Sequence, residues 1–281
     1  MNNTEWTTII KPKPRFFDLN IRELIRYRDL IYLFIKRDFV AYYQQTILGP
    51  FWYIIQPLIT TIVFTIVFGN IARIPTDGIP QPLFYLSGLT IWNYFSTCLS
   101  STSNVFVSNA GIFGKVYFPR LTVPISIVAS NFVRFLIQFI LFLGFYIYFY
   151  ISGANIAPNI FLLIIPVLLL QVAVLGMGCG ILLSSLTTKY RDLGFIVGFG
   201  LQLWMYATPI VYPISQIPEK WRWIYIINPM AQIVEMFKYA FIGIGTVNWI
   251  HYGYTLIATS VILFFGLIMF NKVEKTFMDR V

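Results

Sequence analysis

The sequence has little charge, one histidine and two cysteines. Only 11% of its 281 residues are charged, whereas 58% are hydrophobic. A soluble domain needs more charged side chains than this to cover its surface, so the composition excludes an ordinary globular protein and indicates that lipid is the main solvent. Both cysteines, Cys98 and Cys179, lie inside apolar stretches, which argues against a disulfide framework.

Reactive groups are equally scarce. His251 is the single histidine and the cysteines and carboxylates do not cluster, so the sequence offers no metal site of standard spacing. The stretch from Gly111 to Val116 differs from a phosphate-binding loop, because only two residues separate its glycines and no Ser or Thr follows its lysine. We therefore expect no catalytic residue, metal or cofactor in this chain, and no nucleic-acid partner.

Long apolar stretches dominate the remainder. A bilayer core needs about 20 consecutive apolar residues per helix, and backbone groups in hydrocarbon must form their hydrogen bonds within the segment. Six stretches meet this requirement, which predicts an all-α integral membrane protein with six transmembrane helices. The predicted spans are residues 51–69, 84–108, 121–151, 160–186, 193–211 and 249–270.

Basic residues are distributed unevenly between the two sides of these spans. Most of the 20 Lys and Arg residues fall before the first span, in the loops after the second and fourth spans, and at the C-terminus. Lys and Arg accumulate on the cytoplasmic side of membrane proteins. The distribution therefore predicts that both termini are cytoplasmic.

The sequence before the first span has two parts. Residues 1–17 contain Pro12 and Pro14 and are expected to form a loose cytoplasmic lead-in. Residues 18–45 have the spacing of an amphipathic interface helix, with a basic face toward anionic headgroups or a partner and an apolar face in the acyl boundary. The alternative is a helix packed on another domain. Residues 46–281 form the predicted six-span domain.

Two later segments are interrupted by glycine and proline. Residues 109–120 bracket apolar and aromatic side chains, which predicts a short element that either docks on a partner or buries its aromatics among headgroups. In residues 212–248, Pro213, Pro218 and Pro229 divide two apolar stretches that are too short to cross. These stretches predict re-entrant or interfacial helices on the outer side, between the fifth and sixth spans.

Two further features lie inside the spans. Glycine runs within residues 176–180 and 194–200 are expected to permit close helix packing. Arg134 lies within the third span, where a charge is costly. It either faces a wet cavity or a partner, or pairs with polar groups and snorkels toward the interface.

The aromatic content is high, with 27 Phe, 18 Tyr and 7 Trp. Aromatic rings beside hydroxyl and amide groups suit the flat C–H faces of sugars, so such spans could pass a glycan. The alternative is an interfacial aromatic belt, which accounts for Trp52 better than for Trp92 or Trp204. The candidate channel residues are Trp52, Trp92, Tyr94, Phe95, Arg134, Trp204, Tyr206 and Tyr212.

Four motifs occur together in a familiar order. They are QTILGPFWYIIQP at residues 45–57, KVYFPRLTVP at 115–124, KYRDLG at 189–194, and TPIVYP with INPM at 208–213 and 227–230. From about residue 20 onward the chain resembles the permease subunits of ABC exporters of cell-envelope polysaccharides, such as O-antigen, capsule and teichoic acid exporters. The resemblance implies six spans, an N-terminal interface helix, a cytoplasmic coupling helix and re-entrant outer helices.

The same resemblance implies partners. Two permeases and two copies of a cytoplasmic ATP-binding subunit, which binds ATP and Mg, would move an undecaprenyl-type lipid-linked polysaccharide across the bacterial inner membrane during lipopolysaccharide biosynthesis. The implied ATPase-coupling residues are Gly111, Ile112, Phe113, Gly114, Lys115, Val116, Tyr117, Phe118 and Arg120. A basic entrance for the lipid head is our own hypothesis, and its residues are Arg22, Arg26, Lys36 and Arg37.

Other functions fit less well. Within the same fold, the alternative is an exporter of a drug, heme or small lipid. A secondary transporter should show intramembrane carboxylates and matching broken helices in its two halves, which are not evident here. A membrane-embedded transferase should show clustered histidines or carboxylates, which the sequence lacks.

Overall fold

A computed structural model describes residues 21–44, 47–190 and 192–276. All regular elements within these ranges are helical, as the composition predicts. The lead-in expected at residues 1–17 lies outside the described residues. In chain order the elements are α1 (Ile21–Arg26), α2 (Arg28–Gln44), η1 (Gly49–Phe51), α3 (Trp52–Phe64), η2 (Thr65–Ile71), α4 (Gln81–Ser103), α5 (Val105–Ser108), α6 (Ala110–Phe113), α7 (Thr122–Ile151), η3 (Ile160–Ile164), α8 (Ile165–Thr187), α9 (Leu193–Tyr206), η4 (Ile214–Gln216), η5 (Glu219–Trp221), α10 (Arg222–Ile227), α11 (Pro229–Ile242) and α12 (Trp249–Thr276).

Four helical segments are long and apolar enough to cross a membrane. They correspond closely to the first, third, fourth and sixth predicted spans, which identifies the chain as a multi-pass membrane protein. The last of them extends several residues beyond the predicted end at residue 270, because α12 continues into a polar tail. The four segments are Trp52–Ile71, Thr122–Ile151, Ile160–Thr187 and Trp249–Glu274.

The second predicted span corresponds to α4, but its predicted bounds are wrong. The helix begins at Gln81 and ends at Ser103, and a break at Asn104 separates it from α5. It is less apolar than the other long helices because it carries many hydroxyl groups, several of which bond to carbonyls of the preceding turn. Thr90, for example, donates to the carbonyl of Leu86 at 2.7 Å. These bonds satisfy the hydroxyls and allow α4 to be buried.

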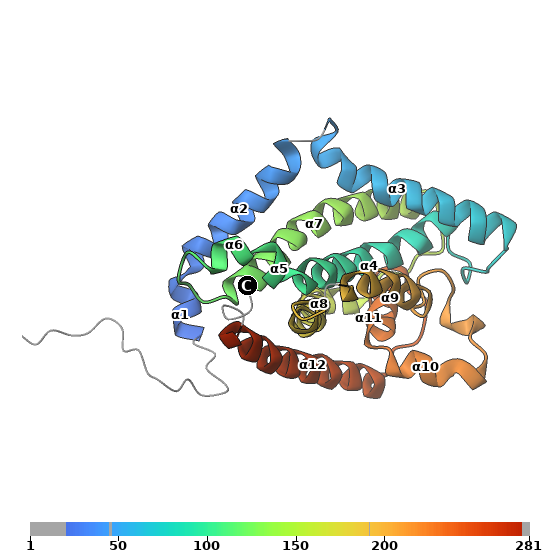
Figure 1. The fold of residues 1–281 in the computed structure, drawn as a ribbon. Helices are drawn as coiled ribbons and strands as arrows, with labels where there is room; N and C mark the ends of the chain where they lie inside the picture. The colour runs from blue at the N-terminus through green and yellow to red at the C-terminus, as the bar shows by residue number, and fades with distance from the viewer. Residues whose placement is uncertain (1–20, 45–46, 191, 277–281) are drawn as a thin grey trace, which may run out of the picture.

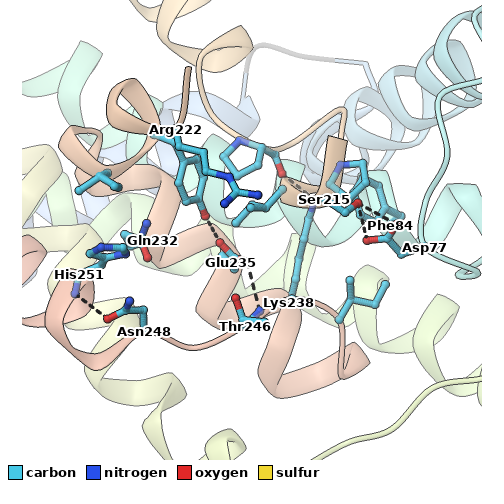
Figure 2. A pocket seen from close by; sticks show the side chains of 17 residues that line it. Asp77, Phe84, Ser215, Arg222, Gln232, Glu235, Lys238, Thr246, Asn248 and His251 are labelled. Carbon is cyan, nitrogen blue, oxygen red and sulfur yellow. Dashed lines mark hydrogen bonds between the residues drawn. The ribbon is translucent and has the colours of Figure 1, made fainter. Parts of the chain in front are cut away.

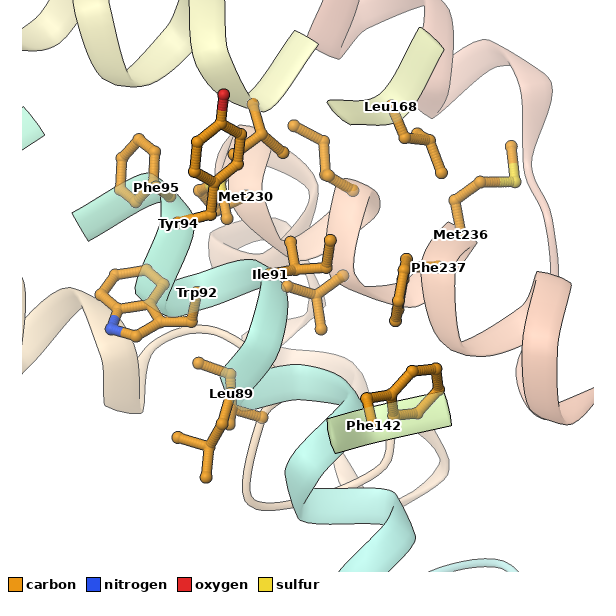
Figure 3. Packing of buried hydrophobic residues seen from close by; sticks show 14 of the residues in the cluster. Leu89, Ile91, Trp92, Tyr94, Phe95, Phe142, Leu168, Met230, Met236 and Phe237 are labelled. Atoms are coloured by element: carbon orange, nitrogen blue, oxygen red, sulfur yellow. The ribbon is translucent and has the colours of Figure 1, made fainter. Parts of the chain in front are cut away.

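Helix α4 is the centre of the molecule. It packs against α7 and α8, and α8 packs in turn against α12. Figure 1 shows these helices running between two ends of the molecule, with α1, α2 and α6 at one end and α10 at the other. Figure 3 shows side chains of α4, such as Ile91 and Phe95, packed with Phe142 of α7, Leu168 of α8 and Phe237 of α11.

The glycine run in α8 permits close helix contact, as predicted. A Cβ atom on Gly180 would lie 2.9 Å from the Leu99 carbonyl oxygen of α4, and one on Gly178 would lie 3.0 Å from Leu263 Cα of α12. In α9 the result differs, since a Cβ on Gly198 or Gly200 would meet no atom within 4 Å. The second glycine run therefore makes no close helix contact within the described chain.

The fifth predicted span and the segment after it differ in detail from expectation. Helix α9 has 14 residues and ends at Tyr206 instead of residue 211. The proline-rich segment then forms short turns and α10, followed by the longer helix α11. Helix α11 starts at Pro229, directly after the capping residue Asn228, and stops at Gly243, whose φ of 80° favours glycine. Because most of α11 is buried, it forms part of the core.

Candidate functional site

The predicted coupling segment, residues 109–120, is mostly a loop. One helical turn, α6, forms within it, and the short coupling helix that the resemblance implies stays a prediction. Phe113 and Phe118 are buried and hold the loop in place. Their rings lie 5.8 Å apart, and the ring of Phe118 lies 5.9 Å from that of Phe34 in α2.

The middle of this segment, residues 114–117, is exposed, and we call it the 114–117 loop. Val116 and Tyr117 are 60% and 82% exposed, beside the exposed Lys115. The carboxylate of Glu23 raises the pKa of Tyr117, and partial burial adds to the effect. The Tyr117 hydroxyl therefore stays protonated at neutral pH and can donate a hydrogen bond. The predicted coupling residues thus separate into buried anchors and an exposed apolar loop.

The side chain of Arg120 contacts α12. Its guanidinium donates to the backbone carbonyl of Glu274 in α12, and its Nε lies 4.0 Å from the Glu274 carboxylate. The guanidinium also lies 5.7 Å from the centre of the Phe113 ring. Arg120 therefore joins the segment to the end of α12.

The segment predicted as an interface helix, residues 18–45, forms two helices within the described residues, α1 and α2. Phe34 on its apolar side is buried against the protein, and α2 packs on α7. The location of this segment at a membrane interface stays a prediction. Arg26, Lys36 and Arg37 are exposed, and Arg37 donates to the carboxylate of Asp38 at 2.8 Å. The side chain of Arg22 lies outside the described part.

A groove of about 390 Å³ runs between α4 and α9. Its α4 wall carries four hydroxyl groups beside Trp92, and its α9 wall carries an amide and two apolar side chains. This combination of an aromatic edge and hydroxyls is the one that the sequence favoured for a glycan path. The lining residues are Trp92, Ser96, Thr97, Ser100, Ser101, Leu201, Gln202 and Met205.

Trp204, another predicted channel residue, is held in a fixed position near the groove. Its ring contacts those of Trp92 and Phe95, with centres 6.4 and 5.0 Å away. Its Nε1 donates to Asn228 Oδ1 at 2.8 Å, and Asn228 Nδ2 donates to the Ala207 carbonyl at 3.1 Å. Asn228 of the INPM motif therefore links the end of α9 to the start of α11 through hydrogen bonds.

The remaining predicted channel residues do not lie together in this chain. Tyr94 is buried in the core. Tyr212 donates to the backbone carbonyl of Tyr206 beyond the end of α9, whereas Trp52 is exposed at the start of α3. The guanidinium of Arg134 in α7 donates to Asn131 Oδ1 at 3.2 Å and lies 5.4 Å from the Tyr53 ring of α3. Their roles in a channel remain predictions.

A second cavity, of about 370 Å³, lies beside α10, α11 and the start of α12 (Figure 2). It contains two buried charges, Glu235 and Lys238, which were predicted only as part of the outer segment 212–248. Burial raises the pKa of the Glu235 carboxyl and lowers that of the Lys238 amine, and their mutual attraction partly offsets both shifts. Their spacing on α11, one turn apart, is the signal that could have revealed this pair.

Both charges have partners. Glu235 accepts from the Tyr225 hydroxyl and from the Thr246 N–H, the latter at 3.4 Å. Lys238 Nζ donates to the Pro209 carbonyl at 2.7 Å and lies 3.5 Å from the centre of the Phe84 ring. The lysine therefore ties α11 to the segment after α9 and to the start of α4.

Known proteins with similar sequences are membrane transporters. The ABC-2 type transporter family matches residues 29–242. The chain is 28% identical over 252 residues to the O-antigen export system permease protein RfbA of Klebsiella pneumoniae, covering 89% of this chain and 94% of that protein. It is 28% identical over 226 residues to the Myxococcus xanthus protein of the same name, covering 79% of this chain and 83% of that protein. The polysialic acid transport protein KpsM of Escherichia coli is 22% identical over 232 residues, covering 82% of this chain and 88% of KpsM.

These matches agree with the four long apolar helices. The family match extends over most of the chain, from α2 to the end of α11. The protein therefore belongs to the ABC-2 type transporter family.

Proposed function

We propose that this chain is the transmembrane subunit of an ABC exporter that moves a lipid-linked, O-antigen-like polysaccharide across the bacterial cytoplasmic membrane, driven by ATP hydrolysis in a separate subunit. The observation that carries the proposal is the similarity, over most of both chains, to permeases named for O-antigen export and polysialic acid transport. The hydroxyl-lined groove between α4 and α9 supports it, because its lining suits sugars better than a purely apolar cargo.

In the proposed topology, α4 and α9 complete six spans. Helix α4 is long enough at 23 residues, and α9 would cross with the turns that flank it. The start of α1 and the end of α12 lie at the same end of the molecule, as an even number of spans requires (Figure 1). We assign this end to the cytoplasm because its loops are basic. A C-terminal reporter exposed outside the cell would contradict this orientation.

The working form is proposed to be a homodimer. Helix α9 exposes Phe195, Ile196 and Phe199 beside its uncrowded glycines, and α3 exposes Ile59 and Ile62. A second copy packed across these helices would turn the open groove into an enclosed path. Failure of two differently tagged copies to purify together from membranes would contradict the dimer.

Coupling to the ATPase is proposed to act through the 114–117 loop, whose exposed apolar side chains suit a partner surface. The buried anchors Phe113 and Phe118 would transmit movement of this loop to α2 and α5. In this arrangement the chain itself holds no cofactor, and the partner subunit binds ATP and Mg.

The basic side of α1 and α2 is proposed to receive the lipid pyrophosphate. A basic residue near an anionic membrane surface contributes about 1 kcal/mol of attraction, but the charge of Arg37 is already neutralised by Asp38. We therefore expect an Arg26→Gln and Lys36→Gln double variant to lower export several-fold, measured as surface polysaccharide at equal protein level. Arg37→Gln is the matched control and should export nearly normally. Normal export by the double variant would refute this entrance.

The function is tested by deleting the gene and measuring surface polysaccharide together with lipid-linked polymer inside the cell. We expect polysaccharide to disappear from the surface and long polymer to accumulate on its lipid carrier. Both pools should return to normal when the gene is restored. Unchanged amounts of both pools would instead favour the alternative function, export of a drug or small lipid.

A further inference from the structure

The 370 Å³ cavity has the properties of a binding site (Figure 2). Its volume falls within the roughly 300–1,000 Å³ that small-molecule sites occupy. Buried side chains, including Tyr225, Gln232 and Glu235, form its floor. Ser215, Arg222 and Asn248 are exposed and form its opening, so a ligand could enter from the surrounding solution.

One buried donor in this floor has no partner. Gln232 is 7% exposed, and its Nε2 atom makes no hydrogen bond within the described structure. A buried amide donor without a partner is costly, because it has lost its hydrogen bonds to water, so its presence calls for an explanation. A ligand that supplies the missing partner provides one.

The charges of the lining favour a neutral ligand. Two carboxylates, Asp77 and Glu235, are balanced by Arg222 and Lys238. Asp77 already accepts from the Ser215 hydroxyl at 3.0 Å, and the buried pair has the partners described above. Arg222 lies 3.7 Å from the Glu219 carboxylate, so each of these charges already has a partner and none is left free for a charged ligand. A hydroxyl group both donates and accepts, and it suits the free amide of Gln232 whichever way that amide is turned.

The cavity touches α4 at Phe84 and the segment after α9 at Pro209, and both residues lie further from the 114–117 loop than the groove does. Phe84 precedes Trp92 by eight residues on α4, which is about 12 Å of helix. Pro209 follows Met205, beyond the end of α9, and therefore also lies on the side of the groove that faces away from the 114–117 loop. A polymer leaving the groove at this end of α4 and α9 would therefore pass close to the elements that form the cavity.

We propose that this cavity binds one neutral sugar unit of the exported polymer as the chain leaves the α4–α9 groove. The inference rests on the proposed function and adds a site to it. Binding would join the loop before α4, through Asp77, to η4, through Ser215, and to α11, through Gln232. The occupied cavity would therefore hold the outer elements in one arrangement during each step of transport.

The test uses the full transporter complex in lipid nanodiscs, with glucose, galactose, mannose and rhamnose as separate probes. Saturation-transfer NMR should detect at least one of these sugars on the unaltered protein. Gln232→Leu should weaken that signal at least tenfold. Without sugar, the Gln232→Leu variant should melt at the same temperature as the unaltered protein or at a higher one, because an unpaired buried amide has been removed.

Gln171→Leu is the matched control. Gln171 is also a buried amide, but it lies on α8 outside the cavity. Its Nε2 donates to Thr255 Oγ1 at 3.1 Å, whereas its Oε1 has no partner within the described structure. We expect this variant to melt at a lower temperature and to bind sugar normally. Lower stability of Gln232→Leu, or equal loss of sugar binding in both variants, would overturn the proposal.

Other outcomes separate this inference from the proposed function. Binding of inorganic phosphate at the cavity, or of none of the four sugars, would overturn the sugar site. The deletion experiment reports polysaccharide export independently of the cavity. Intact export with no sugar binding would therefore refute only the cavity proposal, whereas unchanged polysaccharide pools on deletion would refute the exporter function.

Discussion

Replacing Gly180 by leucine should prevent most of the protein from reaching its folded state. A Cβ at this position would lie 2.9 Å from the Leu99 carbonyl oxygen and 2.7 Å from Thr102 Cβ, both on α4. One of these atoms is backbone, so a change of rotamer cannot relieve the overlap. Overpacking a core costs about 1–3 kcal/mol and occasionally more. Here the cost should exceed that range, because α4 and α8 would have to separate along the centre of the bundle.

The loss of folded protein should be large because no hydrophobic effect drives helix association in lipid. Association of the helices depends instead on close packing and hydrogen bonds. We expect the yield of monodisperse protein in mild detergent to fall several-fold. Gly144→Leu in α7 is the control, because a Cβ there would meet no atom within 4 Å and the position is exposed. Equal yields from the two variants would show that α4 and α8 are not in such close contact.

Truncating Val116 and Tyr117 together to alanine should abolish export without unfolding the protein. Both side chains are largely exposed, so their removal leaves no cavity in the permease. In the proposed complex these side chains meet the ATP-binding subunit, and interface energy concentrates in a few large side chains. Surface polysaccharide should fall at least tenfold at equal permease level, and less ATP-binding subunit should purify with the variant.

Two controls separate docking from folding. Tyr32→Ala removes an exposed aromatic ring from α2, at the same end of the molecule, and should leave export unchanged. Phe118→Ala removes a buried ring, which typically costs about 3–5 kcal/mol, and should lower the amount of folded permease instead. Normal export by the Val116 and Tyr117 double variant would contradict docking at this loop.

The sequence predicted helices best where the apolar run was continuous. The bounds of α7 and α8 follow the predicted spans closely, because nothing in these stretches competes with helix formation in lipid. The prediction was weaker where hydroxyls or prolines intervene. Helix α4 starts earlier and breaks at Asn104, and α9 ends early at Tyr206, since local hydrogen bonds and turn geometry decide such ends.

The candidate site was predicted only in part. The sequence marked Trp92 and Trp204 as unusual, and the structure brings their rings together beside the groove. The sequence did not reveal that Phe113 and Phe118 are buried anchors while Tyr117 is exposed. Aromatic residues in a short loop have no regular spacing from which burial can be predicted.

The sequence by itself determined that lipid surrounds the protein, how the long spans are arranged along the chain, and which family it belongs to. These properties follow from composition, from the length of apolar runs and from local motifs, none of which requires knowledge of how distant residues pack. Only the tertiary structure decided that Gln232 is buried without a partner, that Lys238 reaches Pro209 and Phe84, and that Arg120 reaches Glu274. Each of these depends on residues that are distant in sequence, and no local pattern specifies how separate helices pack against one another.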